Sequence, residues 1–171
     1  MKYRNYQQSP RVDKLLAIIS ENPGFGYTDM LRHSGLKNGV LSHYLSRMEK
    51  YGLIRIKRGK RRIWFFPVNV PTSQYSLIIN LRKETCKIIL TFLLTKGSAT
   101  FSQIVSETKR SPSTISITLS KLLDSELITV EGFDRKYKVR DPIVILMTLK
   151  IIQPNMFDKI KDRFADTFSY F

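Results

Sequence analysis

The chain has 171 residues and carries 29 Lys and Arg against 14 Asp and Glu, a formal net charge of +15. Such a charge attracts polyanions, so the expected partner is nucleic acid or an anionic membrane surface; a basic surface without function is the alternative. The single cysteine excludes a disulfide framework within one chain. No apolar run reaches the roughly 18 residues of a spanning helix, and the first residues lack the apolar core of a signal peptide. We therefore expect a cytoplasmic, nucleoid-associated protein without a membrane partner.

Three helices are predicted in the first part of the chain, after a loose arm over residues 1–10. Apolar spacing predicts a helix over 13–20, which the Asn-Pro-Gly sequence at 22–24 ends. A short second helix is expected over 29–34, with Thr28 as its N-cap. A third helix is expected to start at Asn38, also as an N-cap, and to run to about residue 50.

The third helix has two distinct faces. Leu41, Leu45 and Met48 recur at helical spacing and form an apolar stripe. The opposite face and the helix start offer hydrogen-bonding side chains, which are Asn38, Ser42, His43 and Arg47. A helix held by its apolar stripe presents such a face to the major groove of DNA, although a solvated helix face has the same pattern.

A basic hairpin is predicted next. Residues 53–56 and 63–66 alternate or are rich in strand-forming residues, and the segment between them contains a glycine. Its five cations are Lys57, Arg58, Lys60, Arg61 and Arg62. Cations packed this closely repel one another, but they become favourable against phosphates, and arginine suits a narrow minor groove. The hairpin is therefore predicted to be a DNA-binding wing.

The chain repeats itself at an offset of 74 residues. Ser116 follows Ser42 at this offset, Leu119 follows Leu45, and the Leu-Ile pair at 127–128 follows that at 53–54. A repeat of about 70 residues predicts two similar domains. Residues 1–70 have a net charge of +10 and residues 71–171 a net charge of +5, so the first copy is expected to bind nucleic acid more strongly.

The second copy is predicted to contain the same elements. After a short helical lead-in over 76–80, a helix is expected over 84–96 and another from Thr100 or Ser102. Ser111 caps the third helix, with Pro112 at its first position. Its expected DNA-binding side chains are Ser111, Ser113, Thr114, Ser116 and Lys121.

The surface of the second copy differs from that of the first. Ile117 stands where His43 stands in the first copy, and it is expected either to touch a thymine methyl or to be buried by a neighbouring domain. The second wing, over 129–139, contains two acidic residues beside Lys136 and Lys138, for which we also predict DNA contact.

The residues after 142 have no counterpart in the first copy. An intensely apolar helix is expected over 143–152, followed by a second helix with an aromatic stripe. The stripe consists of Phe157, Ile160, Phe164 and Phe168. It packs either on its own domain or on a second copy of the chain; we predict the second, a homodimer interface that suits a palindromic site.

These motifs resemble a known family. The Asn-Pro-Gly break at 22–24, Gly35 with Asn38-Gly39, the Leu-Ser-x-x-Leu of 41–45 and the Phe-Pro of 66–67 resemble the first domain of archaeal tandem winged-helix regulators. The segment SPSTISITLSKLLDSELI resembles the recognition helix of the ArsR and MarR superfamilies. The resemblance covers residues 11–168 and implies a DNA-binding regulator, with the polar residues of both third helices in the major groove.

No catalytic, metal or cofactor site is predicted. His33, His43 and Cys86 lack the spacing of metal ligands, and Cys86 falls within a helix where a small buried side chain is expected. Neither a glycine-rich phosphate loop nor a nucleophile elbow occurs, so an enzyme is not expected. The sequence reveals no effector pocket and leaves a small-molecule effector unknown.

The sequence thus predicts a mainly α chain with small β-wings, of the α+β class. The predicted organisation is a winged helix-turn-helix domain over 1–70, a second over 71–142 and dimerising C-terminal helices over 143–171. We predict a sequence-specific, double-stranded-DNA-binding transcriptional regulator. The alternatives are a nucleoid-architectural protein without sequence preference, a winged-helix adaptor that binds protein and, with less support, an RNA-binding protein.

Overall fold

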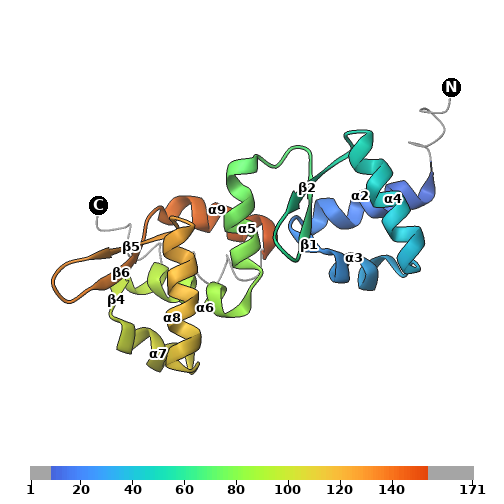
Figure 1. The fold of residues 1–171 in the computed structure, drawn as a ribbon. Helices are drawn as coiled ribbons and strands as arrows, with labels where there is room; N and C mark the ends of the chain where they lie inside the picture. Colours follow the sequence, from blue (N-terminus) through green and yellow to red (C-terminus); the bar gives the residue numbers. More distant parts are fainter. Residues whose placement is uncertain (1–8, 154–171) are drawn as a thin grey trace. The chain divides into compact units, whose positions relative to one another are not determined.

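The computed structural model describes residues 9–153, which form two compact units (Figure 1). The first unit ends at Tyr75 and the second begins at Ser76. Both are mainly helical, and each contains an antiparallel sheet of three strands. The fold is therefore of the α+β class, as predicted.

In the first unit, three helices and a short strand precede a two-stranded hairpin. The elements are α2 (Pro10–Glu21), β1 (Phe25–Gly26), α3 (Tyr27–Ser34), α4 (Asn38–Lys50), β2 (Ile54–Arg58), β3 (Ile63–Pro67) and the 3-10 turn η1 (Thr72–Gln74). The sheet order is β1-β3-β2, so the hairpin is extended by the short strand that leads into α3. In this register Ile56 lies opposite Phe65, which places their apolar side chains on the face of the sheet that covers the helices.

The core of the first unit joins the apolar sides of α2, α3 and α4 to that sheet face. It consists of Val12, Leu15, Ile19, Phe25, Met30, Leu41, Leu45, Met48, Ile54 and Phe65. The predicted stripe of the third helix, Leu41, Leu45 and Met48, is thus buried. Gly35 adopts a left-handed conformation (φ 67°) between α3 and α4, and this turn sets the direction in which α4 leaves.

Two predicted helix starts in the first unit are wrong by one residue. Lys37 is the extended residue before α4, so Asn38 is the first residue of that helix and does not cap it. Likewise α3 begins at Tyr27 after Gly26, whose N–H donates to the Asp29 carboxylate at 3.2 Å. Asn38 is therefore not committed to capping its own helix, which matters for the site below.

The second unit has the same order of elements. It contains α5 (Tyr75–Leu81), which starts at the boundary, α6 (Glu84–Lys96), β4 (Ser98–Ala99), α7 (Phe101–Thr108), α8 (Pro112–Asp124), β5 (Ile128–Glu131), β6 (Lys136–Val139) and α9 (Pro142–Ile152). Its sheet order, β4-β6-β5, matches that of the first unit. Both α7 and α8 begin and end 74 residues after α3 and α4. The predicted caps of this unit are confirmed, because Thr100 and Ser111 accept hydrogen bonds from the N–H groups of Gln103 and Thr114.

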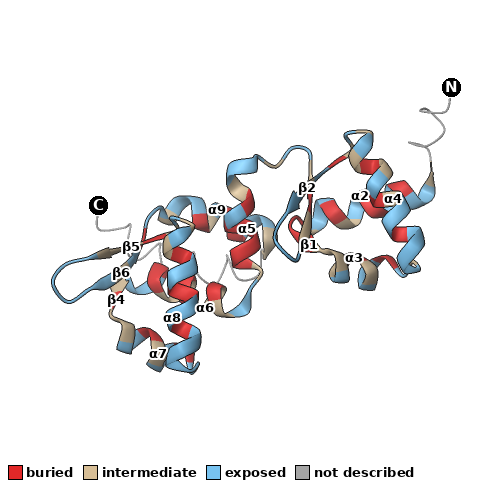
Figure 2. Ribbon diagram, viewed as in Figure 1, coloured by how far each residue is buried: buried red, intermediate tan, exposed pale blue. Residues whose placement is uncertain are grey.

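The core of the second unit includes α9. Ile145 and Leu149 pack in the same cluster as Leu90, Leu119 and Ile128, so one face of this apolar helix belongs to the unit itself. Figure 2 shows the buried sides of α6 and α8 facing inward and the hairpin of β5 and β6 largely exposed. Ile117 is 57% exposed on α8, and the described residues do not bury it.

In the range 9–153, none of the helices is both long enough and apolar enough to cross a membrane.

Candidate nucleic-acid interface

The polar face of α4 is open to solvent. Asn38, Ser42 and His43 are all exposed, while the apolar stripe on the other side of the helix fixes α4 in the core. Since the predicted base-reading residues stand on the face that the core leaves free, α4 can enter a groove without unfolding any part of the unit.

Asn38 is positioned by a neighbouring helix. The Tyr27 hydroxyl, at the start of α3, lies 2.9 Å from the main-chain oxygen of Asn38 and within hydrogen-bond distance of its side-chain oxygen. This contact leaves the amide NH2 group of Asn38 as the hydrogen-bond donor at the first turn of α4. Sequence reasoning missed Tyr27, because nothing in a linear pattern pairs a tyrosine with a residue 11 positions later.

Arg47 lies differently from the other predicted residues of α4. Its side chain is half-buried, with a guanidinium nitrogen 3.0 Å from the Tyr51 hydroxyl and the guanidinium carbon 5.5 Å from the centre of that ring. This contact restricts the rotamers of Arg47 one turn before the end of α4. An arginine ordered in this way loses less conformational entropy when it binds a base or a phosphate.

The first wing is closed tightly around two cations. The Gly59 N–H donates to the Arg62 carbonyl at 2.8 Å, so Lys60 and Arg61 form the tip of the hairpin. A β-carbon at Gly59 would lie only 2.8 Å from the indole of Trp64, so glycine is required for this ring to pack on the wing. The wing cations Lys57, Lys60, Arg61 and Arg62 are all exposed, as a phosphate-binding role requires.

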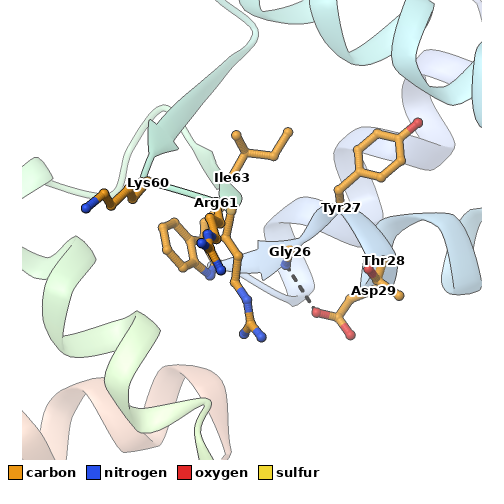
Figure 3. Close-up of a pocket in the computed structure, with 10 residues that line it drawn as sticks. Gly26, Tyr27, Thr28, Asp29, Lys60, Arg61 and Ile63 are labelled. Carbon is orange, nitrogen blue, oxygen red and sulfur yellow. Dashed lines mark hydrogen bonds between the residues drawn. The ribbon is translucent and has the colours of Figure 1, made fainter.

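A hollow of about 570 Å³ separates this wing from the first turn of α3 (Figure 3). Thr28 and Asp29 lie on one side of it, and Lys60, Arg61 and Arg62 belong to the hairpin on the other. The one carboxylate in the wall, that of Asp29, accepts the Gly26 N–H and lies 3.8 Å from the Arg32 guanidinium. The hollow thus has more positive than negative side chains, and its size and open form suit a strand of DNA backbone passing over it.

Arg58 is the wing cation that the structure places differently from its neighbours. Its guanidinium donates two hydrogen bonds of 2.6 Å to the carboxylate of Glu49 on α4, and this contact raises the pKa of Arg58. The pair links the wing to the helix and occupies the side chain for which we predicted phosphate contact. Glu49 was not among the predicted site residues; the available signal is that it is the only acid in α4.

The polar residues of α8 are also exposed, and its first turn is internally bonded. The Ser111 hydroxyl lies 3.1 Å from that of Ser113 and 2.8 Å from that of Thr114. Each hydroxyl keeps acceptor capacity, yet the network orients all three groups before any ligand binds. Ser116 and Lys121 are exposed on the same helix, so the structure brings all five predicted residues of α8 to the surface.

The second wing has a mixed character. Lys136 is exposed, and Lys138 lies 3.9 Å from the Glu131 carboxylate on the neighbouring strand. Phe133, at the tip of this hairpin, is 104% exposed relative to an extended reference. Sequence reasoning placed Phe133 in the turn without noticing that an aromatic side chain there has nothing to pack against.

Two remaining predictions concern the C-terminal stripe and metal binding. Phe157, Ile160, Phe164 and Phe168 lie outside the described residues. Within the described part of the chain, His, Cys, Asp and Glu side chains do not form a group of three that would hold a metal ion. His33 instead lies over Phe25, with ring centres 4.7 Å apart.

One family model matches the second unit. Residues 85–130 match the model described as bacterial regulatory protein, arsR family. The match covers 46 of the 171 residues and runs from α6 through the helix-turn-helix of α7 and α8 to β5. The second unit carries an ArsR-type helix-turn-helix. This motif is of the DNA-binding, regulatory kind and not of an enzymatic kind. No curated protein sequence matches the chain.

Proposed function

We propose that the chain is a sequence-specific transcriptional regulator in which two winged helix-turn-helix domains follow one another. The observation that carries the proposal is the recurrence of the ArsR-type arrangement: α3 and α4 stand 74 residues before α7 and α8, in a unit with the same sheet order. The first unit adds the more basic wing. The domain limits proposed from the sequence, 70 and 142, lie close to the unit boundary at Tyr75 and to the start of α9.

In the proposed complex α4 lies in the major groove, and the wing contacts the backbone or the adjacent minor groove. Asn38, Ser42 and His43 are exposed to read base edges, with Arg47 held nearby by Tyr51. Lys60, Arg61 and Arg62 surround the hollow beside α3, where the backbone strand between the two grooves would lie. The α8 residues and Lys136 and Lys138 are proposed to make a second, weaker set of contacts.

A homodimer is part of the proposal. The outer side of α9 exposes Ile143, Met147 and Ile151 at intervals of four residues, each more than half exposed, and Val144 lies beside them. An apolar stripe of this kind on a short helix suits the same stripe of a second copy around a twofold axis. Sedimentation of the wild type and of a Met147→Glu variant tests this part: we expect a dimer and a monomer, respectively.

Selection of bound sequences from random double-stranded DNA tests the function itself. A palindromic consensus, with two half-sites about 10 base pairs or a multiple of that apart, is expected for a dimeric regulator. Enrichment without a consensus would contradict sequence-specific regulation. It would favour the nucleoid-architectural alternative, for which the exposed cations of the first wing are the supporting observation. Absence of any DNA binding at physiological salt would leave the protein-binding adaptor.

A further inference from the structure

The tip of the second wing holds a large apolar side chain entirely in solvent. Phe133 is 104% exposed and takes no part in the core cluster of its unit. Gly132 (φ 73°) and Arg135 (φ 47°) are both left-handed, and the Arg135 N–H donates to the Gly132 carbonyl at 3.2 Å. This turn leaves Phe133 and Asp134 at the outermost point of the β5–β6 hairpin, which projects from the body of the second unit (Figure 1).

Folding does not account for an aromatic residue at this position. Burial of a phenylalanine side chain contributes about 1.5 to 3 kcal/mol to folding, and a fully exposed one contributes none of it. Turn geometry does not account for it either, because the left-handed residues that the turn needs are its neighbours Gly132 and Arg135. The side chain is therefore available to a partner of the hairpin.

The charges around Phe133 suit an anionic partner. Arg135 and Lys136 are exposed next to it, and neither forms an ion pair with the described residues. Of the two acids in the hairpin, Glu131 lies 3.9 Å from the Lys138 ammonium, which leaves Asp134 to oppose the two unpaired cations. A protein interface ordinarily needs a broad apolar patch, whereas Phe133 stands alone among charged residues.

We propose that Phe133 is a wedge that enters the minor groove and partly unstacks one base step, bending the DNA that the second unit binds. The inference rests on the proposed function, because α8 in the major groove brings the hairpin of the same unit over the flanking minor groove. Apolar side chains inserted between base steps kink DNA in this way, and flanking cations hold the phosphates on both sides. The two wings then differ in mechanism: the first, tipped by Lys60 and Arg61, acts through charge, and the second acts by deforming the duplex.

The test uses the full chain and a duplex of about 30 base pairs, roughly three helical turns, that carries a sequence selected by the protein. Its ends carry a donor and an acceptor dye, and 2-aminopurine replaces one adenine at a time beside the α8 half-site. With the wild type we expect energy transfer between the ends to rise and the fluorescence of 2-aminopurine to increase at one step. The Phe133→Ala variant should lose both signals, and its Kd should rise by roughly 5- to 10-fold, since the ring no longer stacks on a base.

Two further variants make the test specific to a wedge. Phe133→Leu keeps an apolar side chain and should retain most of the bend. Val68→Ala removes another exposed apolar side chain, 49% exposed in the first unit, and should bend DNA like the wild type. Because Phe133 is fully exposed, the Phe133→Ala variant should melt at the wild-type temperature, so loss of the bend cannot be ascribed to unfolding.

The outcomes separate the wedge from the proposed function. If the wild type binds its selected duplex without unstacking a base, or Phe133→Ala bends it equally, the wedge is overturned and the regulator stands. If the wild type selects no sequence and binds no duplex, both are overturned. A Phe133→Ala variant that bends DNA normally but no longer self-associates would overturn the wedge and place Phe133 at a contact between copies.

Discussion

The carboxylate of Glu49 on α4 accepts two hydrogen bonds of 2.6 Å from the guanidinium of Arg58 at the end of β2. The Arg58 side chain is 62% exposed and that of Glu49 31%, so water screens the pair and its contribution to stability is small. Its importance is positional, because the pair connects the proposed recognition helix to the base of the wing. It also sets an acid beside the surface on which DNA phosphates are proposed to lie.

Replacing Glu49 with Gln should strengthen DNA binding without regard to sequence. The change removes a negative charge from the proposed DNA surface and frees Arg58 for a phosphate. We expect Kd to fall by about 3- to 10-fold at about 0.1 M salt, and the salt slope to steepen by about 0.9 because Arg58 then neutralises one more phosphate. Titrations of labelled duplex between about 0.05 and 0.3 M salt measure both quantities.

The matched control for this experiment is Glu21→Gln. Glu21 is exposed at the end of α2, outside the wing and the polar face of α4, and its replacement removes the same charge. If both variants change Kd and slope equally, the effect is one of net charge, and the place given to the Glu49–Arg58 pair is wrong.

Removal of the wing cations should weaken binding to all DNA about equally. In a variant with Lys60, Arg61 and Arg62 changed to Ala, the salt slope should fall by roughly 0.9 for each phosphate that the wing no longer neutralises, with unchanged sequence preference. An Arg11→Ala control removes an exposed cation on α2 and should leave the slope as it is. A slope that stays constant in the triple variant would rule out the phosphate role of the wing.

Arg47 should instead affect sequence preference. Arg47→Ala is expected to reduce discrimination at one base position by about 1 to 3 kcal/mol, the range for a bidentate arginine contact. Tyr51→Phe keeps the ring beside the guanidinium but removes the hydroxyl 3.0 Å away, so a smaller change at the same position is expected. Competition among single-base variants of the selected site measures both, and a uniform loss across them would argue against base reading by Arg47.

The local part of this fold could be predicted from the sequence because its signals are local. The apolar stripes placed the third helix of each copy, and the offset of 74 residues gave the second helix-turn-helix from the first. Ser111 followed by Pro112 fixed the start of α8, since a capping hydroxyl and a proline at the first helical position are short-range requirements. The absence of such a pair near residue 38 is why the start of α4 was misassigned.

The contacts that shape the candidate site depend on tertiary structure and could not be predicted in this way. Five cations within six residues gave no reason to single out Arg58; only the path of β2 past α4 brings it to Glu49. Phe133 posed the opposite problem. An aromatic residue in a turn usually folds back onto its hairpin, and the sequence does not show whether room exists for it. Exposure had to come from the structure.

Equivalent core substitutions should unfold the two units separately. Leu45 on α4 and Leu119 on α8 are each 2% exposed and occupy the same place in the repeat. Leu to Ala at either position should cost about 2 to 5 kcal/mol. Hydrogen exchange followed by mass spectrometry should show faster exchange in the unit that carries the change and little in the other. Faster exchange throughout the chain would mean that the units fold as one domain.

Cys86 should behave as an inert core side chain and not as a sensor. It is 3% exposed on α6, with its sulfur 4.0 Å from the Asn80 side-chain oxygen. Burial raises the pKa of the Cys86 thiol, and the positive charges of Lys83 and Lys121 oppose this only in part. Because a raised pKa leaves less thiolate at about pH 8, the native protein should react with a disulfide reagent at least about 100-fold more slowly than the denatured protein. A Ser106→Cys variant in a Cys86→Ala background places a thiol at an exposed site of α7 and should react fast when native. Native Cys86 reacting as quickly as that control would show an accessible thiolate and reopen a redox role.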